Sequence, residues 1–146
     1  MTIWPISALA LVAANFVVMV LWMVITHGSV EALRTGRSRG PVSTLQPIVG
    51  LAVTLVYFTS GLFPLIPFDL EQPWSNALYL YVVNDIAAFC GVAVFHHMSW
   101  YFQPDSEPPS RSWLAMNYGT LGAFSALALL FPIVDPRPSL QMLGAY

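Results

Sequence analysis

The sequence predicts an all-α integral membrane protein, a four-transmembrane-helix bundle with both termini on the non-cytoplasmic side. Of its 146 residues, 57% are hydrophobic and 8% are charged, and the mean hydropathy is +0.68. Soluble domains average about 25% charged residues, so a soluble fold of this length could not cover its apolar side chains. The charged residues are gathered into short stretches between long apolar runs, with Asp85 as the exception.

The first half of the chain contains two predicted spans. The first covers residues 6–25, an apolar run whose length matches a hydrocarbon core of about 30 Å. Residues 27–44 follow, and their glycines, proline and arginines predict a loop. The second span is predicted over residues 45–66, with Pro47 in its first turn, where a missing N–H costs little. An acidic loop over residues 67–73 is expected after it.

Two more spans are predicted in the second half. The third covers residues 75–102 and stops before Pro104, and a helix of that length must tilt or project from the bilayer. The fourth covers residues 113–134, after a proline-rich loop. The outer tail, residues 135–146, is too short to cross again. We therefore expect a single membrane domain over residues 1–146.

The orientation follows from the arginines. Arg34, Arg37, Arg39 and Arg111 fall in the loops after spans one and three, whereas only Arg137 falls on the opposite side. By the positive-inside rule the first set faces the cytoplasm and both termini face away from it. We expect a multi-pass protein of a bacterial inner membrane, either cytoplasmic or intracytoplasmic.

Close packing of the helices is expected at small residues spaced four apart, because small side chains let helix backbones approach in lipid. One such pair occurs in each span. The pairs are Ala10 with Ala14, Gly50 with Thr54, Ala87 with Gly91, and Gly119 with Ala123.

Asp85 is the strongest candidate for a functional residue. An acid roughly four residues from the centre of a span costs several kcal/mol unless it faces protein or water. No lysine or arginine lies within any predicted span, so we expect the carboxyl to point inward as a neutral hydrogen-bond donor. We expect this buried polar cluster to join helices, with a proton relay and a ligand site as the alternatives. Residues at a similar depth along the spans are expected to join Asp85 in this cluster. They are Asn84, Asn15, Thr59, Ser60 and Ser125.

The three histidines, His27, His96 and His97, all fall near the cytoplasmic ends of spans one and three. Imidazole is an axial ligand for haem iron and, by the same lone-pair chemistry, for the magnesium of (bacterio)chlorophyll. A bis-histidine haem needs two imidazoles at one depth, and His27 lies about one turn nearer the cytoplasm than His96. Neighbours such as His96 and His97 point about 100° apart and cannot chelate one metal. An interfacial histidine without a cofactor is the favoured interpretation.

Several classes of function are excluded by what the sequence lacks. It has no lysine and a net charge of −2, which gives no electrostatic surface for nucleic acid. It contains no nucleophile elbow, zinc-protease motif or P-loop, and its single cysteine forms no pair. We therefore expect no enzyme, no bound metal ion and no soluble small-molecule substrate.

The favoured hypothesis is a non-catalytic accessory subunit that packs within a larger membrane protein complex, of respiratory or photosynthetic type. Its expected partners are the lipid bilayer and other membrane subunits. The second hypothesis rests on residues 95–118, FHHMSWYFQPDSEPPSRSWLAMNY, which loosely resemble part of the multi-span sensor heads of bacterial histidine kinases. A kinase or cyclase region after the last span would favour that hypothesis. The third is a small haem- or pigment-binding module that uses the histidines.

Overall fold

The computed structural model describes residues 6–65, 76–102 and 107–134; the predicted acidic loop and outer tail lie outside this part of the chain. The described residues form four long α-helices and two short 3-10 turns. Each long helix is long and apolar enough to cross a membrane, consistent with a multi-pass membrane protein. In chain order the elements are α1 (Ile6–Arg34), α2 (Pro41–Leu62), η1 (Phe63–Leu65), α3 (Asn76–Ser99), η2 (Trp100–Phe102) and α4 (Arg111–Val134).

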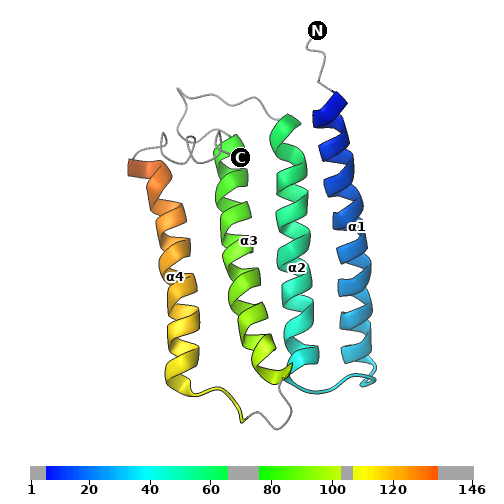
Figure 1. The fold of residues 1–146 in the computed structure, drawn as a ribbon, viewed down its shortest axis with the longest axis vertical. Coiled ribbons are helices and arrows are strands. Elements are labelled where there is room, and N and C mark those ends of the chain that lie inside the picture. The colour runs from blue at the N-terminus through cyan, green and yellow to red at the C-terminus, as the bar shows by residue number, and fades with distance from the viewer. Residues whose placement is uncertain (1–5, 66–75, 103–106, 135–146) are drawn as a thin grey trace.

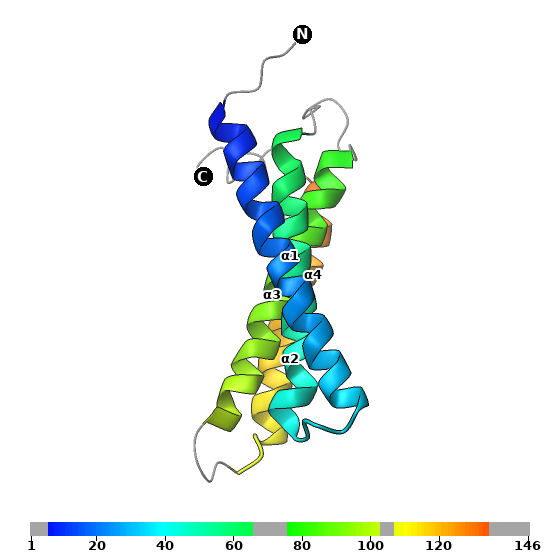
Figure 2. The same ribbon diagram turned by 90° about the vertical axis from the view of Figure 1, so that its right-hand side faces the viewer.

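The four helices stand side by side in chain order, each antiparallel to the next (Figure 1). The packing is extensive between α1 and α2 and between α2 and α3, and it is smaller between α3 and α4. Seen edge-on, the helices cross one another in one twisted layer, and α1 and α4 occupy its two edges (Figures 1 and 2). The prediction of an all-α, four-helix protein is confirmed, but the helices form an open layer rather than a closed bundle.

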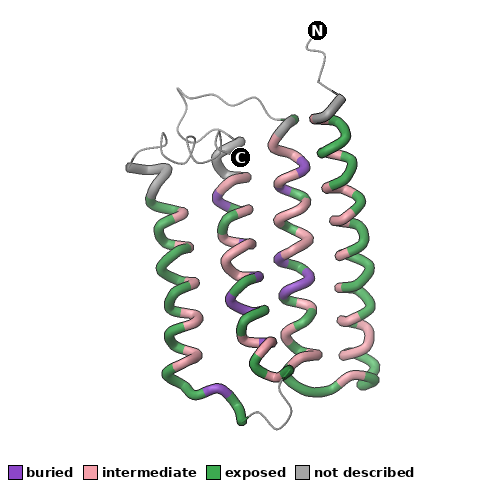
Figure 3. Tube along the Cα trace, in the orientation of Figure 1, coloured by how far each residue is buried: buried purple, intermediate pink, exposed green. Residues whose placement is uncertain are grey.

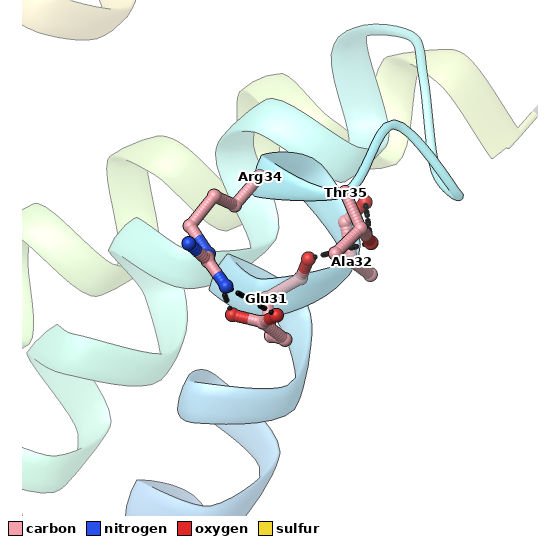
Figure 4. Close-up of polar contacts among 4 residues, drawn as sticks. All are labelled: Glu31, Ala32, Arg34 and Thr35. Carbon is pink, nitrogen blue, oxygen red and sulfur yellow. Dashed lines mark hydrogen bonds and ion pairs between the residues drawn. The ribbon is translucent and has the colours of Figure 1, made fainter.

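Helix α1 continues beyond the predicted end of span one, so the prediction of a loop from residue 27 is wrong. Gly28 costs only about 1 kcal/mol inside a helix. Arg34 donates two hydrogen bonds of 2.9 Å to the Glu31 carboxylate one turn back (Figure 4). The helix ends at Arg34, and Gly36 follows in the cap with a φ of 67°, which suits glycine. The N–H of Arg37 then donates to the Ala32 carbonyl at 2.9 Å, as in a Schellman cap.

Helix α2 begins four residues earlier than predicted. Gly40, with a φ of 112°, precedes the helix, and Pro41 occupies its first turn, where no partner for a proline N–H is needed. Pro47, predicted in the first turn, lies inside the helix instead. The far end of α2 tightens into η1, so the predicted limit at residue 66 agrees closely with the last helical turn.

The buried residues belong mainly to α2 and α3, the two central helices (Figure 3). Val49, Val94 and Met98 form a small apolar core between these helices. Gly50 packs against Thr26 of α1, and Gly91 packs against Ala52, so two of the predicted small-residue pairs lie at helix contacts. The pairs in α1 and α4 lie on exposed surface: Ala10, Ala14, Gly119 and Ala123.

Candidate functional site

Three of the predicted cluster residues form a hydrogen-bonded group between α2 and α3. The Thr59 hydroxyl donates to Asn84 Oδ1 at 2.8 Å, and the Ser60 hydroxyl donates to the same oxygen at 3.1 Å. A carbonyl oxygen has two lone pairs and can accept both bonds. Thr59 is only 1% exposed, and it is the one fully buried polar side chain among the described residues. These three residues therefore join the central helices, as the sequence predicted.

Asp85 does not take the place that the sequence predicted for it. The residue is exposed on the surface of the helix layer instead of buried between helices of this chain. Its carboxyl is in hydrogen-bonding contact with the neighbouring Asn84 side chain. Asn84 therefore faces the interhelical hydroxyls through its oxygen and the exposed acid through its amide. The reason for the difference is geometric: Asn84 occupies the side of α3 that meets α2, and the next residue is turned about 100° away from it.

The other two predicted members lie apart from this group. Asn15 is half-buried on α1, where its Cβ carbon packs opposite Gly61 of α2. Ser125 is half-buried on α4. Neither side chain hydrogen-bonds to any of the described residues. Depth along a span does not say which face of a helix a residue occupies.

A second group of polar side chains links α3 to α4. It lies at the end of the layer that carries Arg34, Arg37, Arg39 and Arg111, and we call this end the arginine end. His97 is half-buried there, and its Nδ1 lies 2.8 Å from the Tyr118 hydroxyl. Its Nε2 lies 3.5 Å from the Tyr101 hydroxyl. Both ring nitrogens of His97 are thus directed at protein partners, which suits a structural role better than a ligand role.

His96, one residue earlier, has a different environment. Its Nδ1 lies 3.0 Å from Asn117 Oδ1 on α4, and Asn117 Nδ2 donates to the Ala93 carbonyl at 2.8 Å. The ring also packs beside Trp113, with 4.9 Å between ring centroids. The residue is exposed. His96 is therefore held in place from one side only, while its other ring nitrogen faces away from these contacts.

Tryptophans reinforce the junction at the arginine end. The Trp100 indole donates to the Glu107 carbonyl at 2.8 Å, and its ring centroid lies 4.9 Å from that of Trp113. These contacts join η2, the connection after it and the first turn of α4. The end of α3 is consequently fixed relative to α4, although the two helices share fewer contacts than the central pair.

The third histidine, His27, lies on a helix that does not pack against α3. Helix α2 stands between α1 and α3 (Figure 1). A single haem bridged by His27 and His96 would have to pass through α2, so that pairing is excluded by the arrangement. His27 itself is exposed and forms no hydrogen bond within the described residues.

The sequence reasoning missed the partners of the histidines on α4. Asn117, Tyr118 and Trp113 were not predicted as site residues. The signal that could have found them is spacing: α3 and α4 are antiparallel, so polar residues near the end of one helix meet polar residues near the start of the next.

Comparisons with family models, curated proteins and solved structures find no match to this chain.

Proposed function

We propose that this chain is a non-catalytic subunit of a larger membrane protein complex, of respiratory or photosynthetic type, in a bacterial inner membrane. The observation that carries the proposal is the exposed carboxyl of Asp85 on an open layer of helices. Other membrane proteins are its partners, together with lipid.

The position of Asp85 along α3 makes its exposure to lipid costly. Asp85 lies about two and a half turns inside α3, and no lysine or arginine lies within that helix. An aspartate at the centre of a membrane helix costs about 2.5–3.5 kcal/mol on insertion scales. Lipid tails cannot donate or accept a hydrogen bond, so they cannot offset this cost. A polar group from another protein, or a water-filled space that such a protein encloses, would offset it.

The shape of the layer supports the same proposal. In a closed bundle other helices of the chain could cover this part of α3, but here the helices lie in one layer and Asp85 is exposed (Figures 1 and 2). Helix α4 also presents small residues along one exposed face, and added Cβ atoms at its two glycines would meet open space. Small-residue faces let a second helix approach closely in lipid. The residues of this face are Ala115, Gly119, Gly122 and Ala126.

We further propose that both termini lie on the non-cytoplasmic side. The support is the arginine asymmetry, with Arg34, Arg37, Arg39 and Arg111 at one end and Arg137 at the other.

The proposal that the chain has no turnover of its own rests on the absence of catalytic motifs from the sequence. Its role would then be to position or seal neighbouring subunits.

Photocrosslinking in native membranes tests the proposal. Val92 is 69% exposed and lies two turns from Asp85 on the same face of α3. A photoreactive residue at position 92 is expected to join the chain to another protein. Val24 of α1, 65% exposed, is the matched control, for which lipid adducts should predominate. Lipid adducts alone at position 92 would count against a partner on this face.

A further inference from the structure

The orientation of the Asn117 side chain determines which nitrogen of His96 carries a proton. Asn117 Nδ2 donates to the Ala93 carbonyl at 2.8 Å. If the amide were reversed, two oxygen atoms would face each other without a hydrogen between them, so this bond fixes the amide. Its Oδ1 is then the atom that lies 3.0 Å from His96 Nδ1. Because a carbonyl oxygen only accepts, Nδ1 of His96 must be the protonated nitrogen.

The other ring nitrogen of His96 therefore carries a free lone pair. In a neutral imidazole with Nδ1–H, Nε2 is the unprotonated atom. His96 is exposed and has no second hydrogen-bond partner among the described residues. Histidines that bind metals usually donate their other N–H to a carbonyl or carboxylate, which fixes the tautomer and the ring orientation. His96 has this arrangement, with Asn117 as the acceptor.

The other two histidines lack this combination of a fixed tautomer and an unpaired ring nitrogen. His97 has protein hydroxyls at both ring nitrogens, at 2.8 and 3.5 Å. His27 is exposed but has no partner within the described part of the chain that would fix its tautomer. Only His96 combines a fixed tautomer with an outward lone pair.

The kind of ligand follows from the number of donors. No group of three or more His, Cys, Asp or Glu side chains gathers in the described residues, so a bare metal ion would lack a protein ligand set there. A metal already held by the four nitrogens of a tetrapyrrole needs only one axial ligand. The surface beside His96 is apolar, since Val92 one turn away is 69% exposed and Met116, next to Asn117, is 66% exposed. Trp113 flanks the imidazole at 4.9 Å between ring centroids.

We infer that His96 Nε2 is an axial ligand for the metal of a membrane-embedded tetrapyrrole, such as a haem or a magnesium chlorin. Asn117 is the positioning residue that sets the tautomer and aims the ring. The step is coordination alone: the lone pair enters the open axial position, and no proton or electron is transferred. This inference is independent of the proposed role as a subunit.

Titration of the purified chain in detergent tests the inference. The probes are zinc protoporphyrin, a five-coordinate stand-in for a magnesium chlorin, and iron protoporphyrin; a preference for one or the other distinguishes the two sources. We expect a saturable shift of the Soret band in the wild type and in His27→Ala, the matched control. His96→Ala should lose the shift, and added imidazole should restore it. Asn117→Leu should weaken binding about 10- to 100-fold.

Nitrogen NMR of the wild type gives an answer that does not depend on how the variants fold. With histidine labelled at both ring nitrogens, the Nε2 signal of His96 should move on addition of zinc protoporphyrin, while the signals of His97 and His27 stay in place. A Soret shift that survives in His96→Ala, or a titration in which no histidine signal moves, would overturn the inference.

Discussion

Thr59 on α2 and Asn84 on α3 are joined by a hydrogen bond of 2.8 Å at the one fully buried polar position of the described residues. The same Asn84 side chain contacts Asp85, which lies exposed on the surface of the layer. A buried link between two helices and an uncovered acid are therefore adjacent. The first joins two helices of the chain itself, and the second is the position at which we propose a partner.

A double-mutant cycle on Thr59→Val and Asn84→Ala measures the buried link. Interhelical hydrogen bonds in membranes contribute about 0.6 kcal/mol on average, and at most about 1.7, so we expect a coupling energy in that range. The value should be modest because the single Thr59 hydroxyl hydrogen has alternative acceptors on its own helix, the Leu55 and Val56 carbonyls. The measurement is the free energy of unfolding in detergent.

The control for this cycle is Ser125→Ala. Ser125 forms no hydrogen bond within the described part of the chain, so its loss should change the unfolding free energy by less than about 0.5 kcal/mol. Zero coupling between Thr59 and Asn84 would contradict their role in joining the helices.

Glycine-to-alanine substitutions should lower the unfolding free energy where helices pack closely but not on exposed helix surfaces. A Cβ at Gly50 would overlap the Thr26 hydroxyl, and the Thr26 Cβ would lie 3.2 Å away, so rotation of that side chain gives no full relief. We expect Gly50→Ala to lower the unfolding free energy by about 1–3 kcal/mol. At Gly119 an added Cβ meets nothing within 4 Å. Gly119→Ala should be neutral or stabilising by up to about 1 kcal/mol.

Thermal unfolding of both variants in detergent provides the comparison. If Gly50→Ala proved as stable as Gly119→Ala, the close approach of α1 to α2 would be wrong.

Substitutions of Asp85 should affect assembly more than the stability of the chain. Because Asp85 is exposed, Asp85→Asn and Asp85→Leu should differ by less than about 0.5 kcal/mol in the unfolding free energy of the purified chain. In membranes the Leu variant cannot form the polar contact that a partner supplies. We expect it to recover about five-fold less partner than the Asn variant, as one lost interhelical hydrogen bond implies. Equal recovery with both variants would contradict a polar partner at Asp85.

Cysteine labelling tests the orientation. In a Cys90→Ala background, single cysteines at positions 37 and 106 are expected to resist an impermeant thiol reagent in intact cells and to react after lysis. The physical reason is the positive-inside rule: Arg37 and Arg39 lie in the connection that carries position 37, and Arg111 directly follows the connection that carries position 106. Reaction in intact cells at both positions would reverse the proposed topology.

The helices could be predicted from the sequence because a span leaves a strong signal in length and composition. The start of α3 was predicted within one residue of Asn76. The extension of α1 was missed because Gly28 and Arg34 were taken as loop residues, whereas the Glu31–Arg34 pair and the Gly36 cap carry the helix further. Glycine and arginine are compatible with both environments, so composition alone could not decide between them.

The candidate site was only partly predictable. Asn84, Thr59 and Ser60 were placed together correctly because the depth of a residue follows from its count along a span. Asp85 was misplaced because an apolar sequence in lipid has little periodicity to mark which side of a helix faces protein. The pairing of His96 with Asn117 depends on the register between α3 and α4, which is set by packing rather than by any local pattern.

We propose that this open layer of helices is completed by other membrane proteins, and purification from native membranes in a mild detergent is the decisive experiment. We expect the chain to be recovered in a larger complex whose other subunits are membrane proteins, and we expect that complex to weaken when Asp85 is replaced by Leu. Recovery of a lone monomer or homodimer, from cells in which membrane complexes remain intact, would contradict it.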